Sequence, residues 1–445
     1  MAVTRVLTRS RGHNDTRRRQ STVILLGTID VAYATGQRIF PVTNELSERD
    51  DVDIDALPLA QDRGVGWQAL RDAGAVCPAG ESFILTSADA VDEAAKAPTV
   101  FSSRRAFDRL GSPLALIPIG TDPPDHTRYR RLLDPFFSPK RMAEREPQLR
   151  QSAAELIDAI AVRGQCELIT DLATPYPSDV FLGLFGLPLR DRDRLNQWKD
   201  SILEFTSPSA TKPSPEVLTH ALELFTYLSE HITRRRQDNS GDDLLTRLIK
   251  TRDEGGLSDE DILGLCFLFV LAGLDTVTAA LGFAFGRLAQ DPSLRRQLAE
   301  DESLIPAFIE ELLRTDGPVP FAPRVTTEDV EVDGILLPKD TTVLMSYGCA
   351  NRDPDRYDDA DELHVGERVP HFAFGKGPHR CLGSHLARME LRIILEEWHR
   401  RIPEYSLADG FEPQVLWPSG TLGLDAVPLV FMPPSEMTSS ATQRR

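Results

Sequence analysis

The stretch of residues 262–286 constrains the fold of this chain most strongly, because its 25 residues carry a single charged side chain, that of Asp275. A run so long and apolar can either cross a membrane or form the buried central helix of a large domain. Ser258, with Asp261 three residues later, has the pattern of a helix start, and a proline after Asp291 marks the end. The resulting helix of about 33 residues would be about 50 Å long. No cluster of Lys or Arg flanks either end, so we predict a buried helix and no membrane span.

The composition is that of a globular protein, with 41% hydrophobic and 27% charged residues. No Gly/Ser-rich or Pro-rich stretch is long enough to separate domains, so we predict a single domain over residues 21–433. An Arg-rich lead-in, residues 1–20, and a tail, residues 434–445, are predicted to be disordered; a transit peptide is the alternative for the lead-in. The net charge of -18 argues against general nucleic-acid binding, because a phosphate-binding surface needs a basic excess.

The cysteines are far apart in the sequence and never form a C-x-x-C pair. This spacing suggests neither a disulfide framework nor a zinc site, and it fits a protein of the reducing cytoplasm. The five cysteines are Cys77, Cys166, Cys266, Cys349 and Cys381.

The order of residue patterns predicts a mainly α fold with a small β region. Turn signals and short β-like runs fill residues 52–100, whereas residues 125–313 have mostly helical periodicity. Residues 324–345 alternate as in a strand pair, with a turn at Asp333 and the glycine after it. Segment 206–215 holds three prolines between two helical patterns and is predicted to be a loop and a candidate mobile lid.

Cys381 has the clearest chemical setting, in the run FGKGPHRCLG at 374–383. The glycines before it let the backbone approach another group closely. A helix follows, since Leu382, Leu386 and Met389 recur on one face. A cysteine where a helix begins is exposed to free N–H groups and to the positive end of the helix dipole, and both favour thiolate over thiol. Such a thiolate can bind a metal or attack an electrophile, whereas most single buried cysteines only fill space.

The same run resembles the cysteine loop of the cytochrome P-450 family, whose pattern F-x-x-G-x-x-x-C-x-G is filled at every fixed position. Two further motifs occur in the order and at the rough spacing of the family: AGLDT at 272–276, and E-x-x-R at Glu311 and Arg314. The resemblance covers about residues 122–430. It implies a cytochrome P-450-like fold with a long central helix over haem, and an oxidoreductase of the soluble bacterial monooxygenase type.

The resemblance also implies residues that hold haem b, which is iron protoporphyrin IX. Cys381 would be the thiolate ligand of the iron, and in this family the thiolate promotes cleavage of the O–O bond. The two haem propionates need cationic or hydrogen-bonding partners, and each such partner alone could equally be a surface charge. The residues that match the family's propionate ligands are His126, Arg130, Arg324 and His379, and further haem contacts are expected from Phe374, Ala272 and Gly273.

Asp275 and Thr276 place an acid beside an alcohol in an apolar wall, where a charge is costly unless it is paired or used. The resemblance implies that this pair is catalytic and delivers protons during oxygen activation. Gly273 removes a side chain beside them and is expected to let a flat ligand or dioxygen lie against the helix. The alternative for Thr276 is a hydroxyl that bonds back to a carbonyl one turn earlier.

Glu311 and Arg314 lie on one helix face, and as a surface pair they would contribute only about 0.2–0.5 kcal/mol. In the family the corresponding pair is buried and braces the segment that leads to the cysteine loop, together with a second arginine. Segment 363–371 is about one residue shorter than usual, and Arg368 is assigned to that second position.

The implied reaction inserts one oxygen atom of O2 into an apolar small molecule, such as a lipid, terpenoid, steroid or aromatic compound. Substrate is expected against Ala272, with Val319 and Phe321 as contacts and residues 107–116 as a roof. Two alternatives stay open. One is a peroxide-driven haem oxygenase, against which the acid and alcohol pair argues, and the other is a haem-thiolate sensor or binding protein without catalysis.

Electrons must come from another protein, because the sequence holds no G-x-G-x-x-G after a strand and no cysteine cluster for an iron–sulfur group. The resemblance implies a separate ferredoxin and an NAD(P)H-dependent ferredoxin reductase, serving a cytoplasmic monomer. Cations near the cysteine could form a basic docking face for an acidic ferredoxin, and a solvated helix of mixed charge is the alternative. These cations are Lys376, Arg380, Arg388, Arg392, Arg400 and Arg401, with Arg128 and Arg131.

Overall fold

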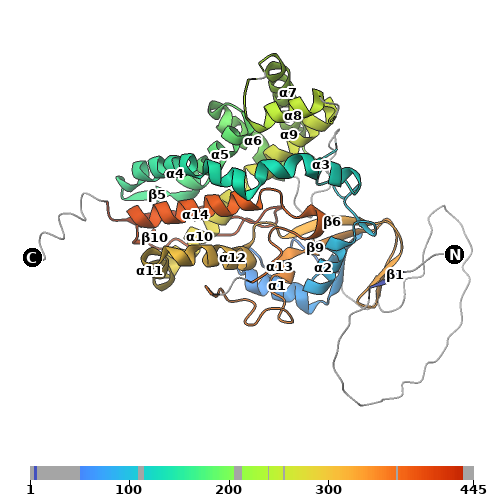
Figure 1. The fold of residues 1–445 in the computed structure, drawn as a ribbon. Helices are drawn as coiled ribbons and strands as arrows, with labels where there is room; N and C mark the ends of the chain where they lie inside the picture. The colour runs from blue at the N-terminus through green and yellow to red at the C-terminus, as the bar shows by residue number, and fades with distance from the viewer. Residues whose placement is uncertain are drawn as a thin grey trace, which may run out of the picture.

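The computed structural model describes residues 5–7, 51–108, 115–204, 213–238, 240–253, 256–366 and 369–433, and it is mainly helical. The helices are α1 (Arg63–Asp72), α2 (Ala88–Lys96), α3 (Asp125–Leu133), α4 (Pro139–Ala161), α5 (Pro175–Phe185), α6 (Arg192–Glu204), α7 (Pro215–Gln237), α8 (Leu244–Asp253), α9 (Asp259–Gly273), α10 (Thr276–Gln290), α11 (Pro292–Glu300), α12 (Ile305–Asp316), α13 (Tyr347–Ala350) and α14 (Ser384–Arg401). Helices α4, α14 and α10 run side by side across the molecule (Figure 1).

The strands form three small sheets, which confirms the predicted small β region. They are β1 (Arg5–Leu7), β2 (Val76–Ala79), β3 (Ser82–Leu85), β4 (Phe101–Ser102), β5 (Gln165–Glu167), β6 (Phe321–Thr326), β7 (Val330–Val332), β8 (Ile335–Leu337), β9 (Thr342–Ser346), β10 (Tyr405–Leu407) and β11 (Pro428–Phe431). The largest sheet has the order β2-β3-β9-β6-β4, and the two smaller sheets are β1-β7-β8 and β10-β11-β5.

The strand pair predicted within 324–345 is present, because β6 and β9 pair antiparallel with Arg324 opposite Val343. The predicted turn at Asp333 closes the hairpin of β7 and β8, and both turn residues have positive φ, 51° at Asp333 and 80° at Gly334. Strand β1 pairs with β7, so the lead-in contains a strand. Most of the lead-in, the tail 434–445 and residues 206–212 of the candidate lid lie outside the described residues.

The predicted central helix is interrupted, and the expectation of one continuous helix is wrong. Its start is as predicted, since Ser258 and Asp261 cap each other's backbone N–H groups at 3.0 and 2.8 Å. The helical hydrogen-bonding pattern then stops between α9 and α10, where Asp275 has φ −124° and ψ −48°. Gly and Asp are both weak helix formers, so the break falls where the sequence supports a helix least.

The interrupted helix lies among other helices. Asp259–Gln290 has the length and the mean hydropathy, 2.1, of a membrane span, and no other helix in the described ranges has both. Helices α5, α6, α7 and α8 pack around α9, while α11, α12 and α14 pack around α10. Side chains such as Cys266, Leu281 and Phe285 are fully buried. The apolar stretch is therefore a core element, because other helices pack around it.

Asp316 ties the end of α12 to three other segments. The carboxylate is fully buried and lies 2.7 Å from Arg63 of α1, 3.0 Å from Arg287 of α10 and 3.7 Å from Arg352, which follows α13. Burial alone would raise the pKa of Asp316, but the charges of the three arginines outweigh it and lower the pKa to about 2. The ionised carboxylate therefore stabilises the fold at neutral pH.

We predict that Asp316→Asn lowers the free energy of unfolding at pH 7 by about 3 kcal/mol, because it leaves buried arginine charge without its partner. Since the folded pKa lies below the unfolded value of about 3.9, the difference from wild type should be constant above about pH 5 and shrink as the pH falls towards 2. Urea denaturation across this pH range measures it. The control is Asp361→Asn, which removes a half-exposed partner of Arg352. An equal loss in both variants would contradict the assignment.

Candidate functional site

The cysteine loop is a tight turn pressed against α2. The backbone N–H of Cys381 donates to the carbonyl of Phe374 at 2.7 Å and closes the loop. Gly375 and Gly377 have φ of 64° and 63°, a region that favours glycine. A Cβ on Gly377 would lie 2.2 Å from the carbonyl oxygen of Ala95, so only glycine fits there. The glycines of this sequence pattern are therefore required by the close approach of the loop backbone to the backbone of α2.

Cys381 precedes α14 by three residues, with Gly383 at the N-cap. Its side chain is accessible at its surface, whereas the other four cysteines are buried. Burial within the loop raises the pKa of the Cys381 thiol, and an N–H of Gly383 and the charges of Arg130, Arg388 and Arg380 oppose this only in part. The N–H at the helix start thus lowers the pKa in the predicted direction, but burial outweighs it. A bound metal cation would supply the missing stabilisation.

Four predicted residues gather beside this loop. His126 and Arg130 come from α3, Arg324 from β6 and His379 from the loop itself. The rings of His126 and His379 lie 4.2 Å apart between centroids. The guanidinium of Arg130 donates to the carbonyl of Arg380 at 2.6 Å, next to Cys381. Residues about 250 positions apart in the chain thus meet at one place.

Three of these residues have no acid within ion-pair distance in the described part of the chain, and the nearest carboxylates, such as that of Asp122, act on them only from farther away. Arg324 is 3% exposed, and its guanidinium donates to the carbonyl of Pro323 at 2.7 Å. His126 is 2% exposed and its Nε2 has no hydrogen-bond partner among the described residues. Burial and then neighbouring positive charges lower the pKa of His126 to about 4 and that of His379 to about 2. Such a cluster fits a dianionic group, because its carboxylates could pair with Arg324 and accept hydrogen bonds from the two imidazoles.

Asp122 and Ser103 belong to this site although we did not single out their side chains in the sequence. Asp122 accepts a hydrogen bond from the backbone N–H of Ser103 at 2.8 Å and one from the hydroxyl of Ser102. The hydroxyl of Ser103 lies 3.0 Å from Nε2 of His379. Asp122 stands four residues before His126, and this spacing was the only available signal. The two serines belong to β4 and its end, which no site motif marks.

The break between α9 and α10 carries the remaining motif. Ala272 is exposed, whereas Leu271 before it is buried and Gly273 after it is half-buried. A Cβ on Gly273 would lie 2.5 Å from the ring of Phe181 on α5. The expected reason for Gly273 is therefore wrong, since its missing side chain admits an aromatic ring and not a ligand.

Asp275 and Thr276 do not bond to each other. The hydroxyl of Thr276 lies 3.5 Å from the carbonyl of Ala272, at the limit of a hydrogen bond. The carboxylate of Asp275 accepts a hydrogen bond from the ammonium of Lys199, on α6, at 2.8 Å. Lys199 carried no signal in the sequence.

Glu311 and Arg314 form a buried pair, so the alternative of a surface pair is wrong. Arg314 donates to both carboxylate oxygens of Glu311, and the pair is less than 5% exposed. The same guanidinium donates to the carbonyls of Asn351, Ala360 and Glu362. Arg314 therefore binds the segment after α13 by its backbone.

Arg368, predicted as the second arginine of this network, lies outside the described residues, so its role stays a prediction. A further arginine, Arg352, donates to the carbonyl of Thr315, one residue after Arg314, at 2.9 Å and to Asp361 at 2.8 Å. Arg352 thus adds a brace between the end of α12 and the segment after α13.

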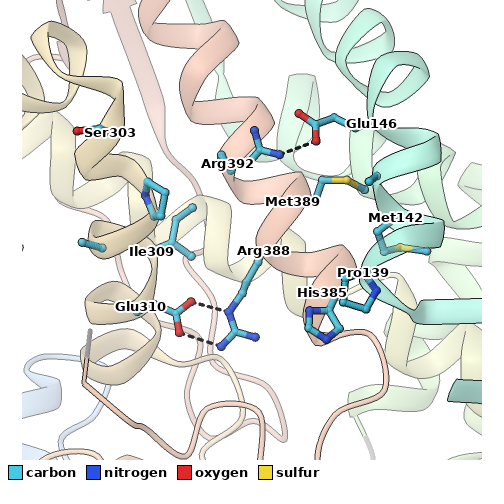
Figure 2. Close-up of a pocket in the computed structure, with 13 residues that line it drawn as sticks. Pro139, Met142, Glu146, Ser303, Ile309, Glu310, His385, Arg388, Met389 and Arg392 are labelled. Carbon is cyan, nitrogen blue, oxygen red and sulfur yellow. Dashed lines mark hydrogen bonds and ion pairs between the residues drawn. The ribbon is translucent and has the colours of Figure 1, made fainter. Parts of the chain in front are cut away.

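A groove of about 520 Å³ lies between α4, α12 and the first half of α14, the helix that follows the cysteine loop (Figure 2). Met142 and Met389 lie along it, from α4 and α14. Arg388 binds both oxygens of Glu310 at 2.5 and 2.8 Å, and Arg392 pairs with Glu146 at 2.8 Å. The groove is therefore rimmed by paired charges.

Ion pairs with acids leave fewer free cations around the cysteine than the predicted basic face requires. Arg388, Arg392, Arg400 and Arg401 all bind acids, and Arg128 lies 3.7 Å from Asp261. Lys376 lies over the ring of Phe372. Arg131 and Arg380 are exposed and form no ion pair within the described ranges. The sequence overestimated the free positive charge because it could not show which arginines meet glutamates across helices.

The predicted substrate contacts occupy different settings. Phe321 packs edge-on against Trp67 at 5.8 Å and lies 6.4 Å from Trp417, which comes from the loop before β11. Val319 is partly buried and packs against the core under the large sheet. Of the expected roof, residues 109–114 lie outside the described part, while the carbonyl of Ala115 lies close to Gly264 of α9.

Comparisons with known proteins agree with this geometry. The family model described as Cytochrome P450 matches residues 79–400. The mycinamicin IV hydroxylase/epoxidase of Micromonospora griseorubida is 36% identical over 313 residues, which cover 68% of this chain and 76% of that protein. The vitamin D(3) 25-hydroxylase of Pseudonocardia autotrophica is 35% identical over 71% of this chain and 77% of its own.

A solved structure shares the fold. The cytochrome P450 CYP109E1 from Bacillus megaterium, solved in complex with testosterone, superposes with a TM-score of 0.76 at 29% identity, over 82% of this chain and 96% of its own. The match includes the cysteine loop, the cationic cluster and the interrupted central helix, since the family model spans all of them. The chain therefore belongs to the cytochrome P450 family and is an oxidoreductase.

Proposed function

We propose that the protein binds haem b through Cys381 and inserts one oxygen atom from O2 into an apolar small molecule. The observation that supports this most directly is the buried basic cluster beside Cys381. Arg324, His126 and His379 have no acid within ion-pair distance in the described part of the chain, and the two propionates of a haem would supply one. Arg130 would add a fourth donor at the edge of the same cluster.

The chain's own residues would divide the work around the bound haem. The haem supplies the redox chemistry of oxygen activation when it is bound. Cys381 would hold the iron from the loop side, with Phe374 packed along the loop. Ala272 would leave space on the opposite side. Asp275 and Thr276 would hold and pass protons at the carboxylate and the hydroxyl, inside a wall that excludes water.

The proposed substrate is an apolar small molecule, such as a lipid, terpenoid, steroid or aromatic compound. Phe321, with Trp67 and Trp417 behind it, offers an aromatic wall, and Val319 is the second proposed contact. Related proteins are named for a mycinamicin, for vitamin D(3) and for a structure with testosterone, and these names support the class. Gly273 is not retained as a ligand contact, since it faces Phe181.

Electrons are proposed to arrive from a ferredoxin and its NAD(P)H-dependent reductase. The exposed Arg131 and Arg380, on α3 and beside Cys381, are the cations that remain for an acidic partner. The protein would work as a cytoplasmic monomer with no nucleic-acid partner.

The ligand assignment is tested on the reduced carbon monoxide complex. Wild type should show the long-wavelength Soret band of thiolate ligation, and Cys381→His should lose it, because imidazole donates less electron density to iron than thiolate does. Cys166→Ala is the control and should keep the band, since Cys166 lies in β5. A band that survives in Cys381→His would contradict the assignment.

The propionate assignment is tested by haem loss. Arg324→Met should raise the rate of haem transfer to apomyoglobin by about tenfold or more, because each charge-assisted hydrogen bond contributes about 1.5–3 kcal/mol. Arg105→Met is the control, since Arg105 is a largely exposed arginine paired with Asp340. Equal transfer rates in the two variants would remove Arg324 from the site.

The reaction class is tested by turnover with a surrogate ferredoxin, its reductase and NADPH, using testosterone and myristic acid as probes. We expect a spin-state shift with at least one probe and a hydroxylated product that requires all three components. Product that forms only with added hydrogen peroxide would identify a peroxide-driven oxygenase. A spectral shift without product under either condition would identify a binding protein.

A further inference from the structure

A polar hollow of about 480 Å³ lies where the start of α5, helix α6 and the start of α7 meet. Its volume falls in the range of small-molecule sites, about 300–1,000 Å³, and is far larger than a single metal ion needs. Of the described residues that line it, four are acids and none is a lysine or an arginine. The acids are Asp193, Asp200, Glu204 and Glu216, so the hollow favours a cation.

The acids of the hollow are only partly compensated by the chain itself. Asp193 and Asp200 each pair with the basic residue that precedes them, at 3.1 and 2.5 Å. Glu204 and Glu216 form no ion pair within the ranges that the structure describes. Glu204 also ends α6, where the helix dipole disfavours a carboxylate, and it lies one turn after the like charge of Asp200. A cation from outside would remove both costs.

Two hydrogen-bonding atoms in the wall of the hollow are buried and lack a partner. Asn196 of α6 is 7% exposed, and its amide nitrogen donates to the hydroxyl of Ser178 at 3.2 Å. Its oxygen Oδ1 accepts no hydrogen bond in the described part of the chain, and the same is true of Nδ1 of His220 on α7. A buried acceptor without a donor is costly. A ligand that carries N–H groups would satisfy both atoms.

The wall distinguishes between kinds of cation. No cluster of His, Cys, Asp or Glu that could hold a metal ion occurs among the described residues. A quaternary ammonium has no N–H for Asn196 or His220, and the described wall has no Phe, Tyr or Trp to form an aromatic cage around it. A primary ammonium has three N–H donors. Because Glu204 and Glu216 belong to different helices, two such groups on one molecule would match them.

We propose that the hollow binds a linear aliphatic diamine or polyamine. Its ammonium groups would pair with Glu204 and Glu216 and donate to Oδ1 of Asn196 and Nδ1 of His220. The methylene chain between them would cross from α6 to α7 and link the two helices. This site is separate from the cysteine loop and the basic cluster, and it does not depend on the function proposed for them.

The experiment is equilibrium dialysis of radiolabelled 1,4-diaminobutane against the haem-loaded full-length protein. It is done at about 150 mM salt, which screens the diffuse attraction of a chain with a net charge of -18. We expect saturable binding of one molecule per chain. 1-Aminobutane has one ammonium and should bind at least about tenfold more weakly, because it leaves one carboxylate unpaired. Magnesium at the same concentration should not displace the diamine.

Variants locate the site. Asn196→Leu removes the buried acceptor at similar volume and should weaken binding about tenfold. Glu204→Gln combined with Glu216→Gln should also weaken it about tenfold, and it decides the question if Asn196→Leu does not fold, because both glutamates are exposed. The charge-matched control combines Glu300→Gln with Glu412→Gln, two exposed acids elsewhere, and should bind as wild type does.

A second readout is hydrogen–deuterium exchange of the backbone amides. The bound diamine should slow exchange in α6 and the first turns of α7 by about fivefold, and it should leave α11 unchanged. Four results would overturn the proposal: no saturable binding, equal weakening in the two double variants, displacement by magnesium, or protection outside α6 and α7 only.

Discussion

A buried arginine beside two imidazoles, with no acid at ion-pair distance in the described part of the chain, is the constraint on which the rest of this structure depends. Arg324, His126 and His379 come from a strand, a helix and a loop that are remote in sequence. Withdrawing such groups from water costs several kcal/mol unless a negative group compensates them. The fold maintains this arrangement beside Cys381, and a dianionic cofactor would resolve it. The chemistry of the site and the stability of this end of the molecule thus depend on the same contacts.

Helix α12 holds that site in place through three acids. Glu310 binds Arg388 of α14, Glu311 binds Arg314, and Asp316 binds arginines of α1, α10 and the segment after α13. Since α14 begins next to Cys381, the Glu310 contact fixes the helix that follows the cysteine. The Glu311 contact fixes the segment that leads towards the loop. The motif E-x-x-R is therefore the part of a larger buried network that a sequence pattern can identify.

The sequence predicted those features that local spacing determines. The cysteine loop needs glycines at fixed positions because a backbone passes within contact distance, and the pattern records this need directly. The capping box at Ser258 and the turn at Asp333 are also local, and both are present. The strand pair and the buried central stretch follow from residue periodicity.

The sequence did not predict contacts between remote segments. Arg352 and Lys199 were missed because only the folded chain shows which charge meets which. The free basic face was overestimated for the same reason. Gly273 was assigned to a ligand, whereas the ring that fills its space comes from α5. The break at Asp275 was missed because the apolar residues on both sides of it continue the helical periodicity.

The central claim is that the sulfur of Cys381 binds haem iron while the basic cluster holds the propionates. A crystal structure of the protein purified from cells supplied with iron and a haem precursor measures this most directly. The account predicts an iron–sulfur bond to Cys381, with both propionates against Arg324, His126 and His379. Iron bound by an imidazole of His126 or His379, or a haem whose propionates point away from Arg324, would contradict it.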